Sequence, residues 1–263
     1  MAQDFKHLAT ALQTLDEATR LKLVELPRII DEWLAPHGGL VGRRVLDFGC
    51  GFGEMAAGIA IGFDPAVVVG IDIGRGPIKG IERLEAWLGP GRLPSNLRLE
   101  QVTPGALGSV DPIDVVVSWS AVEHVAREAL EKILRDLHAR LAPDGVMMIQ
   151  ISPLYFSPAG AHLWPCDYGP WEHLQKSSAE VVADIAACAA LNERQRKAVT
   201  EMFLELNRLT APELIDLVQK AGFRVIRRHI ERTDLTPPAR LTDAYALDAL
   251  TTEQVVLLLK KQG

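Results

Sequence analysis

Cysteine is scarce in this chain of 263 residues, and its three cysteines form no Cys-x-x-Cys pair. Cys50, Cys166 and Cys188 are too few and too scattered for a disulfide framework or a zinc finger. A chain of this length buries enough surface to fold without such cross-links. The sequence therefore predicts a protein of a reducing compartment, and we expect it in the cytoplasm.

Long apolar runs and an excess of basic residues are also missing. No run approaches the roughly 18 residues that a membrane helix needs, and residues 1–6 lack the apolar core of a signal peptide. The formal net charge is −6 and the pI is about 5.7, which argues against a large nucleic-acid-binding surface. We expect neither a membrane nor a nucleic acid as partner, and the sequence leaves the oligomeric state open.

Apolar runs do occur at strand length, and they alternate with helical patterns. Strands are predicted at about 44–48, 67–72, 97–102, 113–118, 146–151, 223–230 and 254–260. Helices are predicted at 78–88, 126–141 and from Thr210 to 221. Strands that are apolar throughout and alternate with helices indicate an α/β fold with a doubly wound, mostly parallel, Rossmann-like sheet of seven strands and helices on both faces.

Two segments stand outside this alternation. Residues 1–37 carry apolar residues at helical spacing, which predicts an N-terminal helical cap of two helices that meet near Pro27. This cap either covers a ligand site or packs on the sheet. Residues 38–263 form the main domain, with an insertion at 152–208 after the fifth strand that contains helices at about 178–190 and 193–209.

A glycine-rich turn, Asp47-x-Gly49-x-Gly51-x-Gly53, follows the first strand and precedes a helix. Glycines there let the backbone turn sharply and let a ligand approach closely. A P-loop is excluded because no Gly-Lys-Ser/Thr follows. The dinucleotide fingerprint fits poorly, because its third glycine is replaced by Glu54 or, two residues further on, by Ala56.

The turn resembles the first motif of class I S-adenosylmethionine-dependent methyltransferases. The resemblance implies that Gly49, Cys50, Gly51 and Gly53 approach the amino-acid part of the cofactor S-adenosylmethionine. It also implies that Asp47 holds the ammonium group of the cofactor. An ordinary strand-to-helix turn with a capping acid is the alternative.

Three further positions match cofactor contacts of the same family. Asp72 ends the second strand, where the family places the acid that binds the ribose, and Ile73 follows it. The family often carries an Asp after the third strand that contacts the adenine, and this chain has none there. Thr103 or Gln101 is the polar residue that we expect to replace it.

The fourth strand ends in a segment that resembles the fourth motif of the family, from Ser118 to Glu123-His124-Val125. Ser118 is therefore expected beside the cofactor. The turn at Pro143-Asp144-Gly145 and the last helix and strand also resemble the family, so that the resemblance covers about 40–151 and 209–261.

The resemblance implies an enzyme that transfers a methyl group to an acceptor by in-line displacement. A small-molecule acceptor and O-methylation are favoured, because His and Tyr side chains are plentiful near the expected pocket. His124, His162 and His173 are candidates for a general base. His124 has an alternative role as a structural residue at a helix start.

The insertion supplies the candidate acceptor pocket, because it gathers aromatic residues in a chain that is only 6% aromatic. Tyr155, Trp164, Tyr168 and Trp171 are the candidate substrate-binding residues. The alternative is an aromatic loop that only packs on the sheet. No metal is predicted, since the spacing of the histidines and acids in this segment matches no known zinc motif.

Two other functions remain open from the sequence. One is a nicotinamide-dependent oxidoreductase on a similar sheet, which would use the poor dinucleotide fingerprint. The other is a non-catalytic binding protein that keeps the fold. The acid at 47, the glycines and the acid at 72 favour the methyltransferase over both.

Overall fold

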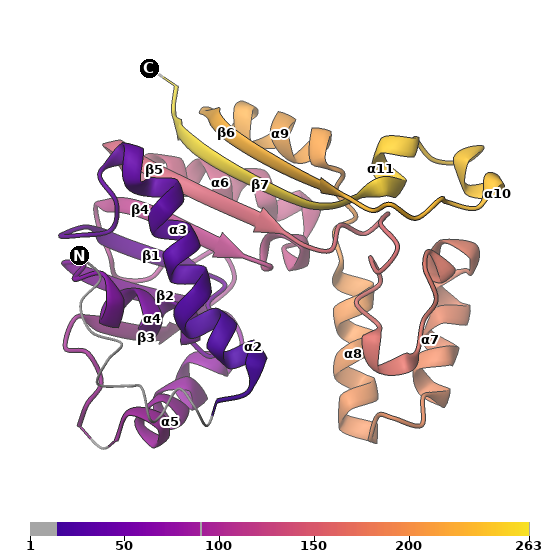
Figure 1. Ribbon diagram of the computed structural model, residues 1–263, viewed down its shortest axis with the longest axis horizontal. Helices are drawn as coiled ribbons and strands as arrows, with labels where there is room; N and C mark the ends of the chain where they lie inside the picture. The colour runs from indigo at the N-terminus through magenta and orange to yellow at the C-terminus, as the bar shows by residue number, and fades with distance from the viewer. Residues whose placement is uncertain (1–14, 90, 263) are drawn as a thin grey trace.

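The computed structural model describes residues 15–89 and 91–262, and the strands within these ranges form one seven-stranded sheet (Figure 1). The sheet order is β3-β2-β1-β4-β5-β7-β6. Strands β1 to β5 run parallel, and β7 runs antiparallel between β5 and β6. The predicted mostly parallel sheet is therefore confirmed. The strand bounds are β1 (Arg44–Phe48), β2 (Val67–Asp72), β3 (Leu97–Gln101), β4 (Ile113–Trp119), β5 (Leu141–Ile151), β6 (Phe223–Arg232) and β7 (Thr252–Lys261).

Helices cover both faces of the sheet, as the sequence predicts for a doubly wound fold. One face is covered by α3 (Leu26–Leu34), α4 (Glu54–Gly62) and α5 (Gly76–Leu88), and the other by α6 (Arg127–Arg140) and α9 (Ala211–Lys220). Helix α9 begins with a capping box between Thr210 and Glu213, with a proline in its first turn.

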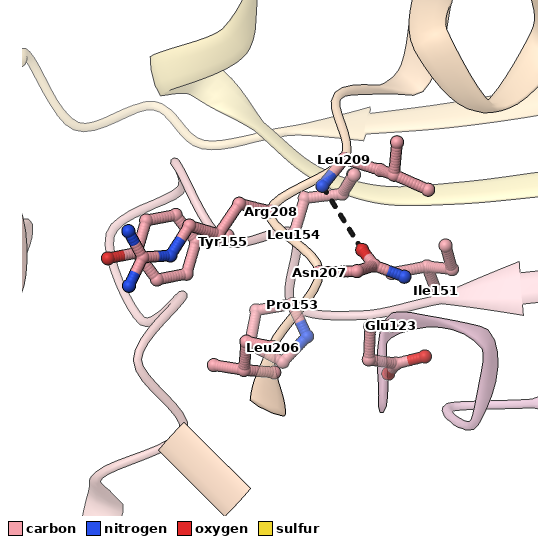
Figure 2. Close-up of a pocket in the computed structure, with 9 residues that line it drawn as sticks. All are labelled: Glu123, Ile151, Pro153, Leu154, Tyr155, Leu206, Asn207, Arg208 and Leu209. Atoms are coloured by element: carbon pink, nitrogen blue, oxygen red, sulfur yellow. Dashed lines mark hydrogen bonds between the residues drawn. The ribbon is translucent and has the colours of Figure 1, made fainter. Parts of the chain in front are cut away.

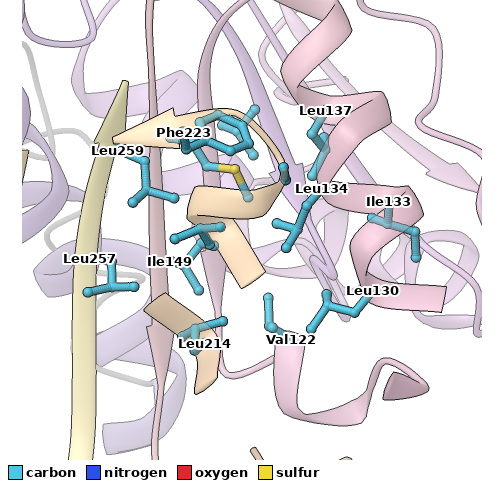
Figure 3. Close-up of a cluster of buried hydrophobic side chains, with 14 of the residues drawn as sticks. Val122, Leu130, Ile133, Leu134, Leu137, Ile149, Leu214, Phe223, Leu257 and Leu259 are labelled. Atoms are coloured by element: carbon cyan, nitrogen blue, oxygen red, sulfur yellow. The ribbon is translucent and has the colours of Figure 1, made fainter. Parts of the chain in front are cut away.

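The apolar stripe of α6 packs on the sheet next to α9. Leu130, Leu134 and Leu137 are almost fully buried, and they share one cluster with Leu214 of α9 and Phe223 of β6 (Figure 3). Burial of each large apolar side chain contributes roughly 1.5–3 kcal/mol. These contacts fix the start of α6 and the turn before it, which border the candidate site.

The N-terminal helical run packs on the same face of the sheet as α4. Helix α2 (Glu17–Arg20), a π-helical turn (Leu21–Glu25) and α3 follow one another directly, and Pro27 stands in the first turn of α3. Within the described residues this run is continuous from Glu17 to Leu34, and the π-helical turn ends two residues before Pro27, whose nitrogen cannot donate a helical hydrogen bond. The part of the predicted cap at 1–14 lies outside the described residues, and the domain boundary at residue 37 stays a prediction.

The insertion forms a lobe with its own small core. Helices α7 (Ser178–Ala187) and α8 (Glu193–Glu205) stand side by side away from the sheet (Figure 1). Val181, Ile185 and Phe203 are buried between them. Both helices end earlier than predicted, because Cys188 and Leu206 adopt extended backbone. The boundaries of the insertion at 152 and 208 stay predictions.

Two short helices after β6 are absent from the sequence-based prediction. Helix α10 (Ala239–Thr242) and α11 (Leu247–Thr251) lead into β7. Leu241 and Leu250 from these helices bury Trp171 of the insertion. Across 15–89 and 91–262, no helix has the length and apolar character that would let it cross a membrane.

Candidate functional site

A cavity of about 1250 Å³ opens at the carboxyl ends of the parallel strands. Its walls are the turn after β1, the end of β2, the loop after β3, and the turn after β4 with the start of α6. The π-helical turn at 21–25 and the end of α8 complete it. Ligand sites in such sheets lie at this edge. The volume exceeds the ~300–1000 Å³ that one small ligand usually occupies, so it has room for two.

The glycine turn forms the floor of the cavity, and its glycines serve different purposes. Gly49 adopts φ +78°, and a Cβ there would lie 2.3 Å from the Cβ of Ala121. Gly51 adopts φ +56°, and a Cβ there would meet nothing within 4 Å. Gly49 thus permits close packing of the protein itself, whereas Gly51 leaves the space beside it open for a ligand.

Asp47 lies at the bottom of the cavity and has no partner among the described residues. Its side chain is fully buried, and neither carboxylate oxygen receives a hydrogen bond there. Burial is the main cause that raises the pKa of Asp47 to about 7; the carboxylates of Asp72 and Glu54 act in the same direction, whereas the nearby backbone N–H of Ala56 and the charge of Lys22 act against it. An unpaired buried carboxylate is costly. Asp47 therefore fits a site for a cationic ligand group.

Asp72 lies at the rim, at the end of β2. Its carboxylate accepts hydrogen bonds from the backbone N–H of Gly51 at 3.0 Å and of Gly74 at 2.7 Å. These bonds hold the carboxylate against the glycine turn, and its remaining lone pairs can accept from a ligand diol. Ile73 beside it lines the cavity and is 63% exposed.

Six of the nine predicted cofactor residues line the cavity: Asp47, Gly49, Cys50, Gly51, Asp72 and Ile73. The other three lie next to lining residues. Gly53 is the N-cap residue of α4 and adopts φ +80°. Thr103 is exposed and stands between the lining residues Val102 and Pro104. Ser118 is buried and directly precedes the lining residue Trp119. The structure therefore brings six of the nine predicted residues together in the cavity wall and leaves three outside it.

His124 also lines the cavity. It ends a 3₁₀ turn after β4, Val122–His124, and its ring is partly buried. Burial lowers the pKa of His124, so that its imidazole is neutral near pH 7. The ring of His162 packs edge-on against it, with 5.4 Å between the ring centroids.

His162 and His173 do not line the cavity. The Nε2 atom of His162 lies 3.0 Å from the carbonyl oxygen of Pro153, and that of His173 lies 2.7 Å from the carbonyl oxygen of Tyr155. Burial lowers the pKa of each to about 4, so that both rings are neutral and each Nε2–H donates to its carbonyl. Two of the three candidate bases are thus engaged in structural hydrogen bonds.

The four predicted aromatic substrate residues also lie outside the cavity wall, which corrects the expected position of the pocket. Trp171 donates from Nε1 to the carbonyl of Leu250, and Tyr168 donates to Asp184 at 2.6 Å. Trp164 is 64% exposed on the lobe surface. Tyr155 borders a separate, water-sized cavity. Tyr155, Tyr168 and Trp171 thus pack within the lobe, whereas Trp164 does not.

Several residues that line the cavity gave no recognisable signal in the sequence. Lys22 of the π-helical turn lies near Asp47, and Trp119 ends β4. Ser120 also lines it, and its hydroxyl donates to Oε1 of Gln150 at 3.0 Å. Gln150 is 2% exposed in an otherwise apolar strand. A buried Gln in such a run was the one signal that could have indicated a polar site.

Comparison with known proteins gives a family model described as a methyltransferase domain, which matches residues 18–228. Two relatives are named ubiquinone biosynthesis O-methyltransferase. The one from Aeromonas salmonicida is 36% identical over 121 residues, 45% of this chain and 47% of the relative. The one from Pseudomonas putida is 30% identical over 149 residues, which are 55% of this chain and 60% of the relative. The chain thus spans about half the length of the curated relatives it matches.

Solved structures share the fold at low sequence identity. A putative sarcosine dimethylglycine methyltransferase from Galdieria sulphuraria has a TM-score of 0.57 at 14% identity, covering 90% of this chain and 86% of that one. An S-adenosylmethionine-dependent methyltransferase from Clostridium acetobutylicum has a TM-score of 0.56 at 10% identity, covering 98% of both. At such identities the likeness concerns the fold.

Proposed function

The chain belongs to the class I S-adenosylmethionine-dependent methyltransferases, and we propose that it methylates an oxygen atom of a small-molecule acceptor. The methyltransferase-domain match over 18–228 carries the family membership. It decides against the nicotinamide-dependent oxidoreductase that the sequence left open.

One observation supports the proposal most strongly. A single cavity is lined both by an unpaired, buried carboxylate, Asp47, and by a neutral imidazole, His124. The first suits a cationic group of the cofactor, and the second suits a proton acceptor for the acceptor hydroxyl. We call the wall formed by residues 47–73 the cofactor end, and the wall with Trp119 and His124 the acceptor end.

The cofactor end holds S-adenosylmethionine in this proposal. The cofactor supplies a methyl group activated on a sulfonium. Asp47 pairs with its ammonium, Gly51 leaves room for its amino-acid part, and Asp72 accepts from its ribose hydroxyls. Lys22 is the nearby cation for its carboxylate, because it lies in the same wall. Ile73 and the loop at Thr103 border the adenine.

The acceptor end positions a hydroxyl and takes its proton. His124 accepts that proton on its neutral imidazole, which is the form in which a histidine acts as a base. Trp119 and Ser120 border the same space, and Leu204 closes it from the lobe. Holding the acceptor in line is the main catalytic task, because positioning alone supplies much of the rate in such a transfer.

Oxygen and a small acceptor are supported by three observations. The two relatives above are named O-methyltransferases, although the matched part covers about half of each. The net charge of −6 disfavours a nucleic acid. The thiols of Cys50, Cys166 and Cys188 are free, which suits the cytoplasm as the place of the reaction.

The test is transfer of a labelled methyl group from S-adenosylmethionine to a panel of phenols, catechols, thiols and amines. We expect label in hydroxyl-bearing compounds, and a loss of roughly 100-fold or more in kcat for His124→Gln with cofactor affinity retained. Label only in amines or thiols would contradict O-methylation. Cofactor binding with no transfer to any panel member would favour a non-catalytic binding protein.

A further inference from the structure

The insertion returns to the sheet at residues 204–209, here called the return segment, directly beside the turn that carries His124. The backbone N–H of Asn207 donates to the carbonyl of Glu123 at 2.9 Å. Leu206 and Asn207 line the large cavity together with His124. The return segment therefore forms part of the same wall as the proposed base.

The side chain of Asn207 holds both ends of that turn. Its Nδ2 donates to the carbonyl of Val122 at 2.7 Å and to the carbonyl of Val125 at 3.1 Å. Its Oδ1 accepts from the backbone N–H of Leu209 at 3.1 Å, the dashed line in Figure 2. Every hydrogen bond fits one orientation of the amide, so its nitrogen and oxygen are unambiguous.

Apart from Asn207, the turn is held by the buried side chain of Val122 and by the hydrogen bond of 3.1 Å from the backbone N–H of Val125 to the carbonyl of Val122. Within the described residues, the carboxylate of Glu123 has no hydrogen-bond partner and faces a cavity of about 10 Å³, the size of one water molecule (Figure 2). His124 itself is held by its own backbone N–H, which donates to Ala121 at 3.0 Å, and by the edge of the His162 ring. Asn207 is thus the side chain that fixes the carbonyls on either side of the Glu123–His124 pair.

We propose that Asn207 is a positioning residue, which orients the His124 imidazole toward the acceptor by tying the turn to the return segment. This inference rests on the proposed role of His124. It assigns the insertion a part in the reaction. The first part of the insertion places His162 against the imidazole of His124, and its last part places Asn207 where it binds the backbone carbonyls of the turn.

The proposal is tested through the position of the ring, which needs no acceptor. Burial lowers the pKa of His124 in the intact protein, so that a ring released into the cavity moves back toward the ordinary value of about 6.5. His162 contacts the ring, Glu123 precedes it in the chain, and the charged side chains of the same cavity wall are Lys22, Asp47, Glu54, Asp72, Arg127, Glu128, Lys132 and Glu205. Asn207→Ala changes none of them, and it keeps the backbone bond to Glu123.

Asn192→Ala is the matched control. Asn192 caps α8 in the same lobe, where its Oδ1 accepts from the backbone N–H of Gln195 at 2.9 Å. Its loss weakens the lobe by removing a helix cap, but it leaves the His124 turn untouched. A general loss of lobe stability therefore shows equally in both variants, whereas a positioning effect shows only at Asn207.

The experiment is an NMR titration of the imidazole resonances, with His124→Gln used to assign the His124 signal, alongside calorimetric titration with S-adenosylmethionine. We expect Asn207→Ala to raise the His124 pKa by about half a unit or more, Asn192→Ala to leave it unchanged, and both to bind the cofactor within about twofold of the parent protein. An unchanged pKa in Asn207→Ala, or an equal shift in Asn192→Ala, overturns the proposal.

Asn207→Ser provides the decision if Asn207→Ala does not fold. It retains one donor, so we expect a smaller rise in the His124 pKa, and the absence of any rise again overturns the proposal. Failure of the cofactor to bind the folded parent protein would instead contradict the proposed function, and the pKa result would still decide the role of Asn207.

Discussion

The cofactor end and the acceptor end of the cavity draw on the chain in different ways. Most of the cofactor end comes from one stretch, Asp47 to Ile73, which forms a strand, a glycine turn, a helix and a second strand. The acceptor end joins Leu21 of the helical run, Trp119 and His124 after β4, and Leu204 of the insertion.

This difference has physical consequences. The cofactor end is held by hydrogen bonds such as those that the backbone N–H groups of Gly51 and Gly74 donate to the carboxylate of Asp72. The acceptor end depends on how a separate lobe, with its own core, docks on the turn at His124. We therefore expect the cofactor end to tolerate changes in the lobe, and the acceptor end to be sensitive to them.

The largest effect is expected from filling the cofactor end. Gly51→Arg places a long side chain in the space that is open beside Gly51, and we expect cofactor affinity to fall by roughly 1000-fold, about 4 kcal/mol. Gly42→Arg is the control, since Gly42 also has a positive φ and open space but does not line the cavity. Calorimetry measures both, and normal binding by Gly51→Arg would break the assignment of the cofactor end.

A smaller loss is expected from Asp47→Asn. Removing one member of a buried charge pair costs about 2 kcal/mol or more, so we expect affinity for S-adenosylmethionine to fall at least roughly 30-fold. Burial raises the pKa of Asp47 to about 7, and the carboxylate that pairs with the ammonium is therefore lost as pH falls through 7. The affinity of the parent protein for S-adenosylmethionine should therefore decline from pH 8 to pH 6. A variant affinity equal to that of the parent protein at pH 8 would exclude Asp47 from the site.

Glu123→Gln probes the stability of the acceptor end. Burial raises the pKa of Glu123 from 4.5 to about 8, so the folded state prefers the protonated acid. The stability that this group contributes is fully present below pH 4.5 and is lost as pH rises through 8. We expect Glu123→Gln to be more stable than the parent protein by about 4 kcal/mol at pH 8, and equally stable at pH 4. Denaturant unfolding at the two pH values measures the difference, and an equal effect at both would contradict the buried acid.

The smallest effect is expected from Trp171→Phe at the far side of the lobe. The variant loses the hydrogen bond from Nε1 to the carbonyl of Leu250, 3.0 Å long, and we expect about 1 kcal/mol of destabilisation. Cofactor affinity should not change, because Trp171 does not line the cavity. A clear fall in that affinity would show that changes in the lobe affect cofactor binding, and it would contradict the independence of the two ends of the cavity.

The sequence predicted the parts of the molecule that are encoded locally. Strands such as Val67–Asp72 are continuous apolar runs, and their bounds agree with the structure within about one residue for most strands. Thr210, Pro212 and Glu213 predicted the start of α9 because a cap and its partner lie within one turn. Asp47 and Gly51 were recognised because strand, turn and helix are adjacent in the chain.

The residues that tertiary docking brings to the cavity and the lobe could not be predicted in the same way. Lys22 sits in a helical stripe that reads as ordinary packing, and Asn207 follows a helix that the pattern extended to residue 209. Trp171 was assigned to the substrate because nothing in the sequence revealed α11, which buries it. Residues that meet only through tertiary docking leave no local pattern, and aromatic content alone does not distinguish a pocket from a core.

The central claim is that one end of the cavity binds S-adenosylmethionine independently of the other. Calorimetric titration with S-adenosylmethionine of the parent protein, Gly51→Arg and His124→Gln tests it directly. The account predicts saturable binding by the parent protein, no binding by Gly51→Arg, and binding by His124→Gln within about twofold of the parent protein. Absence of binding by the folded parent protein, or its loss in His124→Gln, would contradict the account.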